Sequence, residues 1–106
     1  MKTRYHTDQL ARVLKALGDE TRLRVVASLS GGERCVCEIE EELDIAQSLL
    51  SFHLKTLKEA GVLSDRREGR WVFYALNREV LREAGDFLTD AVSSESRLPI
   101  HPARCR

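Results

Sequence analysis

The two residues whose types and spacing are best suited to chemistry are Cys35 and Cys37, which are separated by a single valine. Thiolates are soft ligands and prefer thiophilic ions to Mg²⁺ or Ca²⁺. In a regular helix, side chains two residues apart point about 200° away from each other, whereas in an extended or distorted segment they lie on the same side. Capture of one ion by both sulfurs therefore favours a break at the start of the helix expected here. The alternative is that the two cysteines are small buried side chains that pack like alanine.

A second set of side chains lies on a helix expected over residues 46–60. Leu50, Leu54 and Leu57 recur at the spacing of an inward-facing stripe. The candidate DNA-binding residues on the opposite face are Gln47, Ser48, Ser51, Phe52 and Lys55. Glutamine can form two hydrogen bonds with adenine, serine can bond base edges or phosphate, and an exposed phenylalanine can contact the methyl group of thymine. We therefore expect this helix to read double-stranded DNA.

Two further candidates for DNA contact have open roles. His53 lies between the apolar and polar faces of the same helix, so its position suits a hydrogen-bonded packing role as well as a contact with a base or phosphate. Arg66, Arg67 and Arg70 lie in and beside a turn and are candidates for contact with phosphates or the minor groove. The alternative is a solvated turn whose arginines pair with neighbouring carboxylates.

The spacing of the apolar residues predicts the helices that position these side chains. The predicted helices cover residues 8–17, 19–29, 36–43 and 46–60. Asp19 is expected to cap the second helix, which carries Leu23, Val26 and Ala27 on one face. Gly61 is expected to end the helix that reads DNA.

The pattern changes to a period of two between residues 62 and 76, which predicts a β-hairpin with a basic tip. Asn77 then caps a last helix. The fold class is therefore mainly α with a small β-hairpin, a winged helix-turn-helix whose hairpin contacts the DNA backbone or minor groove. Residues 1–94 are expected to form the DNA-binding and dimerisation domain, and residues 95–106 are expected to be a flexible tail.

Composition restricts the class of protein. Seventeen lysines and arginines balance seventeen acidic residues, but the net charge is −5 over residues 31–44, +3 over residues 1–30 and +2 over residues 45–76. No apolar run approaches the ~20 residues of a membrane span. Three cysteines favour a reducing cytoplasm over a disulfide-stapled secreted fold. No phosphate-binding loop or arrangement of nucleophile and base is visible, so we do not expect an enzyme.

Four motifs within residues 16–77 closely resemble the ArsR/SmtB family of metal- and metalloid-responsive repressors. They are LGDETRLRVV (17–26), CVCE (35–38), QSLLSFHLKTLKEAGVL (47–63) and REGRWVFYAL (67–76). The resemblance implies a homodimeric repressor that leaves its operator when thiol ligands capture an inducer ion. Phe52 stands where members of the family commonly carry a polar or basic residue, which concerns the bases that are read rather than DNA binding itself.

The resemblance also implies the kind of inducer. Relatives that sense As(III) or Sb(III) commonly continue the motif as Cys-x-Cys-x-x-Cys, but the third position here is Glu40. A trigonal site for these ions wants a third sulfur, and Cys105 is the remaining cysteine. The expected inducer is therefore As(III) or Sb(III), bound by Cys35, Cys37 and Cys105, with no organic cofactor.

Two other inducers stay open for the same fold. Cadmium and lead sensors of the family add cysteines from the N-terminal arm, and residues 1–8 contain none. A redox-responsive repressor would pair Cys105 with Cys35 or Cys37 on oxidation. A zinc-type site on the last helix is not expected, because residues 78–98 contain no histidine.

The first and last helices each carry an apolar stripe that a domain of this size cannot cover by itself. A homodimer formed through these two helices would bury both stripes. It would also present two recognition helices about one turn of DNA apart.

Overall fold

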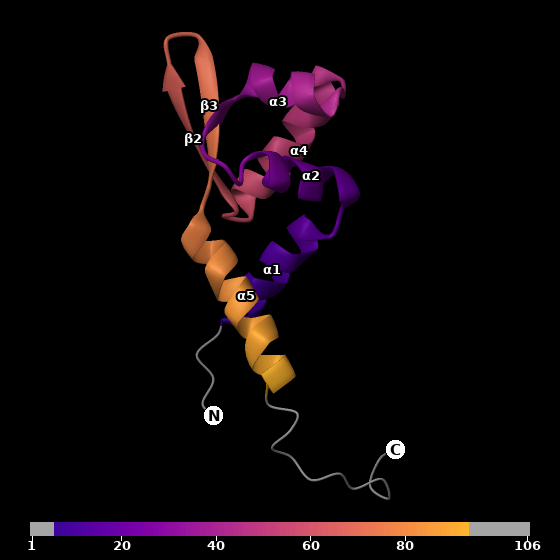
Figure 1. The fold of residues 1–106 in the computed structure, drawn as a ribbon, viewed down its shortest axis with the longest axis vertical. Helices are drawn as coiled ribbons and strands as arrows, with labels where there is room; N and C mark the ends of the chain where they lie inside the picture. Colours follow the sequence, from indigo (N-terminus) through magenta and orange to yellow (C-terminus); the bar gives the residue numbers. More distant parts are fainter. Residues whose placement is uncertain (1–5, 94–106) are drawn as a thin grey trace, which may run out of the picture.

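The computed structural model describes residues 6–93 and has five helices and three strands in that range (Figure 1). The helices are α1 (Thr7–Leu17), α2 (Glu20–Ser28), α3 (Val36–Leu43), α4 (Gln47–Glu59) and α5 (Arg78–Ser93), and the strands are β1 (Arg34–Cys35), β2 (Leu63–Glu68) and β3 (Trp71–Leu76). The predicted winged helix-turn-helix architecture is confirmed. The predicted tail at residues 95–106, with Cys105, lies outside the described residues.

Local signals in the sequence end and begin the helices where they were expected. The carboxylate of Asp19 accepts a hydrogen bond from the backbone N–H of Arg22 at 3.1 Å and caps α2. Between α3 and α4, Asp44 takes a left-handed conformation with φ 55°, and Gly61 after α4 has φ 86°. Asn77 Oδ1 lies 3.5 Å from the backbone nitrogen of Val80 at the start of α5.

The sheet has one strand more than the predicted hairpin. Strands β2 and β3 form the hairpin, and β1 pairs antiparallel with the other edge of β3, so the strand order is β1-β3-β2. Cys35 faces Phe73 in this register. A strand of two residues is too short to show an alternating pattern in the sequence. Its pairing also depends on a partner strand almost forty residues away.

Helices α1 to α4 and the base of the hairpin share one hydrophobic core. The largest fully buried side chains are Leu29, Ile39, Leu50, Leu54, Leu57, Val25 and Val62. The expected inner face of α2 is wrong in part, since Leu23 is 51% exposed and Ala27 is exposed, whereas Val25 is fully buried. Helix α2 packs against α1, α3 and α4, and these neighbours select Val25 and Leu29 as the inward residues.

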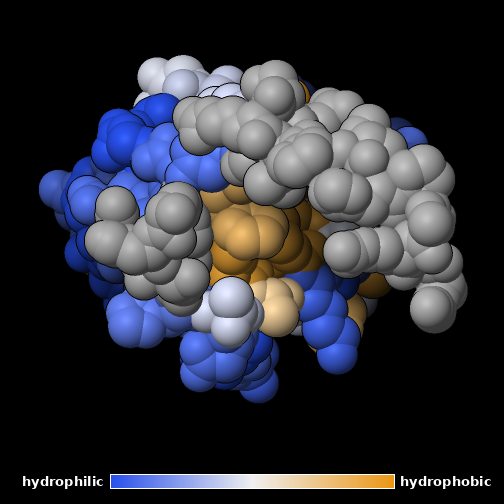
Figure 2. All heavy atoms as spheres, turned by 90° about the horizontal axis from the view of Figure 1, so that it is seen from below, coloured by the Kyte–Doolittle hydropathy of each residue, from blue (hydrophilic) through white to orange (hydrophobic). Residues whose placement is uncertain are grey.

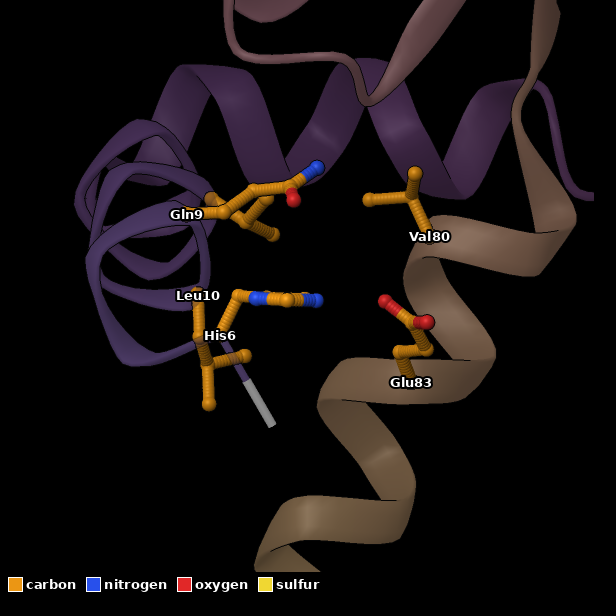
Figure 3. Close-up of a pocket in the computed structure, with 6 residues that line it drawn as sticks. His6, Gln9, Leu10, Val80 and Glu83 are labelled. Atoms are coloured by element: carbon orange, nitrogen blue, oxygen red, sulfur yellow. The ribbon is translucent and has the colours of Figure 1, made fainter. Parts of the chain in front are cut away.

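Helices α1 and α5 lie side by side at the opposite end of the molecule from the hairpin tip (Figure 1). A pocket of about 20 Å³ lies between them, enough for a single water. Figure 3 shows His6, Gln9 and Leu10 on one side of this pocket and Val80 and Glu83 on the other.

The C-terminal half of α5 is the least covered apolar surface in the described range. Leu88 is 52% exposed and Val92 is 74% exposed. Figure 2, which views the molecule from below, shows hydrophobic side chains gathered at the centre of this end.

Candidate nucleic-acid interface and thiol pair

Helix α4 separates its residues into a buried and an exposed face as predicted. Leu50 and Leu57 are fully buried and Leu54 is nearly so. The five expected DNA-binding residues, Gln47, Ser48, Ser51, Phe52 and Lys55, are all exposed. Ala46 precedes the helix in an extended conformation with ψ 145°. The first turn of the helix carries small and polar side chains on its outer face, which would let the protein backbone approach a groove of DNA.

Leu49 was not predicted from the sequence to lie on the exposed face of α4, but it is 47% exposed, and its neighbour Phe52 is 58% exposed. A leucine in a helix is usually assigned to the core. The signal that could have found it is its angular position, which lies outside the arc of the three buried leucines.

His53 is the one candidate on α4 that lies inside the protein. Its side chain is 8% exposed, and its Nδ1 lies 3.1 Å from Nη1 of Arg22 and 3.9 Å from Oδ2 of Asp19. Arg22 in turn donates from Nε to the carbonyl oxygen of Ala16 at 2.6 Å. His53 thus connects α4 with the start of α2 and the end of α1. Of the two roles left open by the sequence, the hydrogen-bonded packing role is the one that this placement supports.

The three wing arginines are all exposed, but they differ in their partners. Arg66 donates from Nε and Nη2 to both carboxylate oxygens of Glu33 at 2.7 and 2.9 Å and from Nη1 to Glu68 at 2.7 Å. It also lies over the ring of Phe73, with 4.6 Å between Cζ and the ring centroid. These hydrogen bonds from Arg66 hold the pKa of the Glu33 carboxyl below its usual value. Arg66 is therefore largely neutralised by the protein itself.

Arg67 and Arg70 are the wing arginines without a carboxylate partner among residues 6–93. The guanidinium of Arg70 lies over the ring of Trp71, with 5.4 Å between Cζ and the ring centroid. Gly69 forms the tip of the turn with φ 64°, a conformation that favours glycine. The tip therefore presents two positive charges to solvent.

The thiol pair lies where β1 passes into α3. Cys35 is the N-cap of α3 and is extended with ψ 149°, and its backbone N–H donates to Glu38 Oε1 at 2.9 Å. Because the chain changes from extended to helical between Cys35 and Val36, the side chains of Cys35 and Cys37 lie on the same side of the chain, with their sulfurs 2.8 Å apart. Cys35 is 7% exposed and Cys37 is exposed. The geometry that the sequence required for joint capture of an ion is present.

The two thiols are free and share a hydrogen bond. This bond to Cys35 raises the pKa of the Cys37 thiol, with burial and the nearby Glu38 acting in the same direction. A protonated pair of this kind must lose protons when it binds a metal or metalloid ion.

The thiol pair and the candidate DNA-reading residues border the same cleft. It has a volume of about 370 Å³ and is open to solvent. Its walls include Cys35 and Cys37 from one side, Gln47 and Ser51 from α4, and Arg67 and Arg70 from the wing. Glu40 also lines it. Among residues 6–93, no cluster of three or more Cys, His, Asp or Glu side chains could hold a metal ion.

Comparison with known proteins identifies the family. The family model of bacterial regulatory proteins of the arsR family matches residues 19–65, which include the thiol pair and α4. The arsenical resistance operon repressor of Escherichia coli is 42% identical over 81 residues, covering 76% of this chain and 69% of that protein. This chain belongs to the ArsR family.

One further relative and one solved structure are also similar to this ArsR-family protein. The arsenic resistance transcriptional regulator ArsR1 of Pseudomonas putida is 48% identical over 69 residues, 64% of this chain. The match spans only 54% of the length of that regulator. A solution structure of the homodimeric winged helix-turn-helix DNA-binding domain of a possible ArsR-family regulator from Mycobacterium bovis is 29% identical, with a TM-score of 0.68. It covers 95% of this chain and 99% of that domain.

The family and the fold are those of DNA-binding transcriptional regulators and not of enzymes. Between residues 6 and 93, no helix combines the length and apolar character needed to cross a membrane.

Proposed function

We propose that this ArsR-family protein is a homodimeric repressor that binds double-stranded operator DNA and releases it when Cys35 and Cys37 capture As(III) or Sb(III). The observation that carries the proposal is the shared cleft, which is bordered by the paired cysteines, by the exposed face of α4 and by the basic wing. The similar repressors of arsenic resistance support As(III) as the inducer.

DNA binding follows from the placement of the two exposed surfaces. Helix α4 enters the major groove with Gln47, Ser48 and Ser51 toward the base edges. Lys55 and the exposed wing arginines contact phosphates, which fix the register of the protein on the duplex. The dimer forms through α1 and α5. Leu88 and Val92 of α5, which are exposed in one subunit, are buried against the partner.

Inducer capture uses the softness of sulfur. Cys35 and Cys37 would hold the metalloid as thiolates. At each sulfur, the thiol proton and one hydroxide ligand of the metalloid would leave together as water, and the hydrogen bond between the two thiols would be lost. We propose Cys105, which lies outside the described residues, as the third sulfur, from the same subunit or its partner. A reducing cytoplasm keeps all three thiols available.

The position of Cys35 would allow inducer binding to change the position of the wing. Cys35 pairs with Phe73 in the sheet, and Arg66 covers the ring of Phe73 while holding Glu33 through two hydrogen bonds. A shift of the chain at the thiol pair therefore displaces β1, Glu33 and Arg66 together. Because Cys37 is in the first turn of α3, the same shift loosens the helix that precedes α4. Both effects bias the dimer away from the form that binds DNA.

The decisive test is operator release by different ions. An operator is first selected from random-sequence DNA with the wild-type protein, and its binding is followed by fluorescence anisotropy with a thiol-free reductant present. We expect As(III) and Sb(III) to release it at lower concentrations than Cd(II), Pb(II) or Zn(II). Release by Cd(II) or Pb(II), without release by As(III) or Sb(III), would mean that the inducer is one of those metal ions and not a metalloid. Release by peroxide or disulfide reagents, without release by arsenite under reductant, would instead favour a thiol-redox repressor.

The different partners of the wing arginines predict different salt dependences of DNA binding. The slope of log K against log salt is negative. Substitution Arg67→Gln should make it less steep by about 1 for each replaced arginine that touches a phosphate, because one fewer counterion is released. The matched substitution Arg66→Gln should change the slope less, since Glu33 and Glu68 already neutralise Arg66. Anisotropy titrations at several salt concentrations measure both slopes. Equal changes for the two variants would contradict the assignment.

A further inference from the structure

Helix α4 exposes two large apolar side chains that the buried core does not use. Leu49 and Phe52 are 47% and 58% exposed. They lie three residues apart, so they are neighbours on one flank of the helix. Both side chains lie outside the core and are therefore accessible to a partner that contacts this flank of α4.

The two flanks of α4 differ in chemistry. Gln47 and Ser51 line the cleft shared with the wing, whereas Leu49 and Phe52 are absent from its walls. Ser48 and Lys55 lie between the two flanks and are exposed. A helix that enters the major groove with this arrangement presents hydrogen-bonding groups on one side and an apolar surface on the other.

Phe52 is held in place from the protein side. Its ring meets the ring of His53 edge to face, with centroids 5.3 Å apart and planes at 62°. His53 is buried and bonded to Arg22 at 3.1 Å, and Arg22 is anchored on the carbonyl of Ala16 at 2.6 Å. This chain of contacts restricts Phe52 before DNA arrives, which lowers the entropy lost on binding.

The apolar group that the major groove offers is the C5 methyl group of thymine. We propose that Leu49 and Phe52 form a thymine-reading surface that selects operators with thymine at the positions facing this flank. This inference rests on the proposed DNA-binding function of α4. It assigns Phe52 a specificity role and adds Leu49 to the interface.

The test replaces individual thymines of the selected operator with deoxyuridine, which removes the methyl group and leaves every hydrogen-bonding group in place. We expect the wild-type protein to bind about 3- to 10-fold more weakly when a contacted thymine is replaced. In the Phe52→Ala or Leu49→Ala variant, the ratio of the affinity for the thymine operator to that for the deoxyuridine operator should be close to 1 at the thymine that the replaced side chain contacts. Because both side chains are exposed, the variants should keep their thermal unfolding midpoints.

The control variant Lys55→Gln should weaken binding to both DNAs while keeping their ratio. An unchanged ratio in Phe52→Ala and Leu49→Ala would overturn the thymine surface, as would equal wild-type affinity for every thymine and deoxyuridine pair. Dissociation of the dimer by either substitution, with the ratio unchanged, would instead assign the flank to a second copy. Failure of the wild-type protein to select any DNA would overturn the proposed function itself.

Discussion

Replacing Cys37 with serine is expected to weaken the release of operator by arsenite severely while leaving operator affinity nearly unchanged. Cys37 is exposed in the first turn of α3, and its sulfur lies 2.8 Å from that of Cys35. A serine hydroxyl has nearly the size of a thiol but is a hard, weakly acidic ligand for a thiophilic ion. Loss of one of two or three sulfur bonds should raise the arsenite concentration for half release by about 100-fold or more.

The matched substitution Cys35→Ser should have the same effect on release for the same reason. Cys35 is the N-cap of α3, and serine is among the residues preferred at that position. The variant should therefore fold and bind the operator. Cys105→Ser tests the proposed third sulfur, and we expect a smaller loss of response than with either of the other two. Anisotropy titrations with arsenite under reductant measure all three variants. Full arsenite response in either Cys35→Ser or Cys37→Ser would exclude the thiol pair as the inducer site.

Introducing a charge at Leu88 is expected to cause the largest loss of operator binding of any single surface change. Leu88 is 52% exposed on the C-terminal half of α5, in the proposed dimer contact. Substitution Leu88→Glu would place two unpaired carboxylates in an apolar interface, which strongly disfavours association. Because a monomer engages only one half-site, the affinity for a two-half-site operator should fall by about 100-fold or more.

Sedimentation velocity at micromolar concentration checks the first step of this prediction, and anisotropy checks the second. The control is Thr89→Glu, which adds the same charge one residue further along α5, on a different face. It should keep the dimer and most of the operator affinity. A Leu88→Glu variant that stays dimeric, or a wild-type protein that is monomeric, would contradict dimerisation through α5.

Local features of the chain were sufficient to predict most of the elements. The stripe of Leu50, Leu54 and Leu57 located α4 and its buried face, because helical periodicity depends on neighbours three and four residues away. Asp19 and Gly61 marked helix boundaries through local backbone chemistry. The spacing of Cys35 and Cys37 defined the condition for joint ion capture. A break at the start of the third helix is a local property, and it lies where that condition requires it.

Other features required the tertiary structure because their partners are distant in sequence. The hydrogen-bond partner of His53 could not be predicted from the sequence, because Arg22 lies 31 residues away on α2. Arg66 resembled the other wing arginines until folding brought Glu33, 33 residues away, against it. Periodicity also left the inward face of α2 undetermined, because that face depends on which helices surround it.

By itself, then, the sequence determined the order of the helices and the hairpin, the exposed face of α4 and the thiol spacing, since each is recorded in a periodicity or spacing of neighbouring residues. Only the tertiary structure decided that the thiols, the outer face of α4 and the wing border one cleft. It also decided that Arg67 and Arg70 keep their charge available to a partner, while Arg66 is held by the protein. The physical reason is that pairing across the sheet and between helices depends on long-range contacts, which no local pattern records.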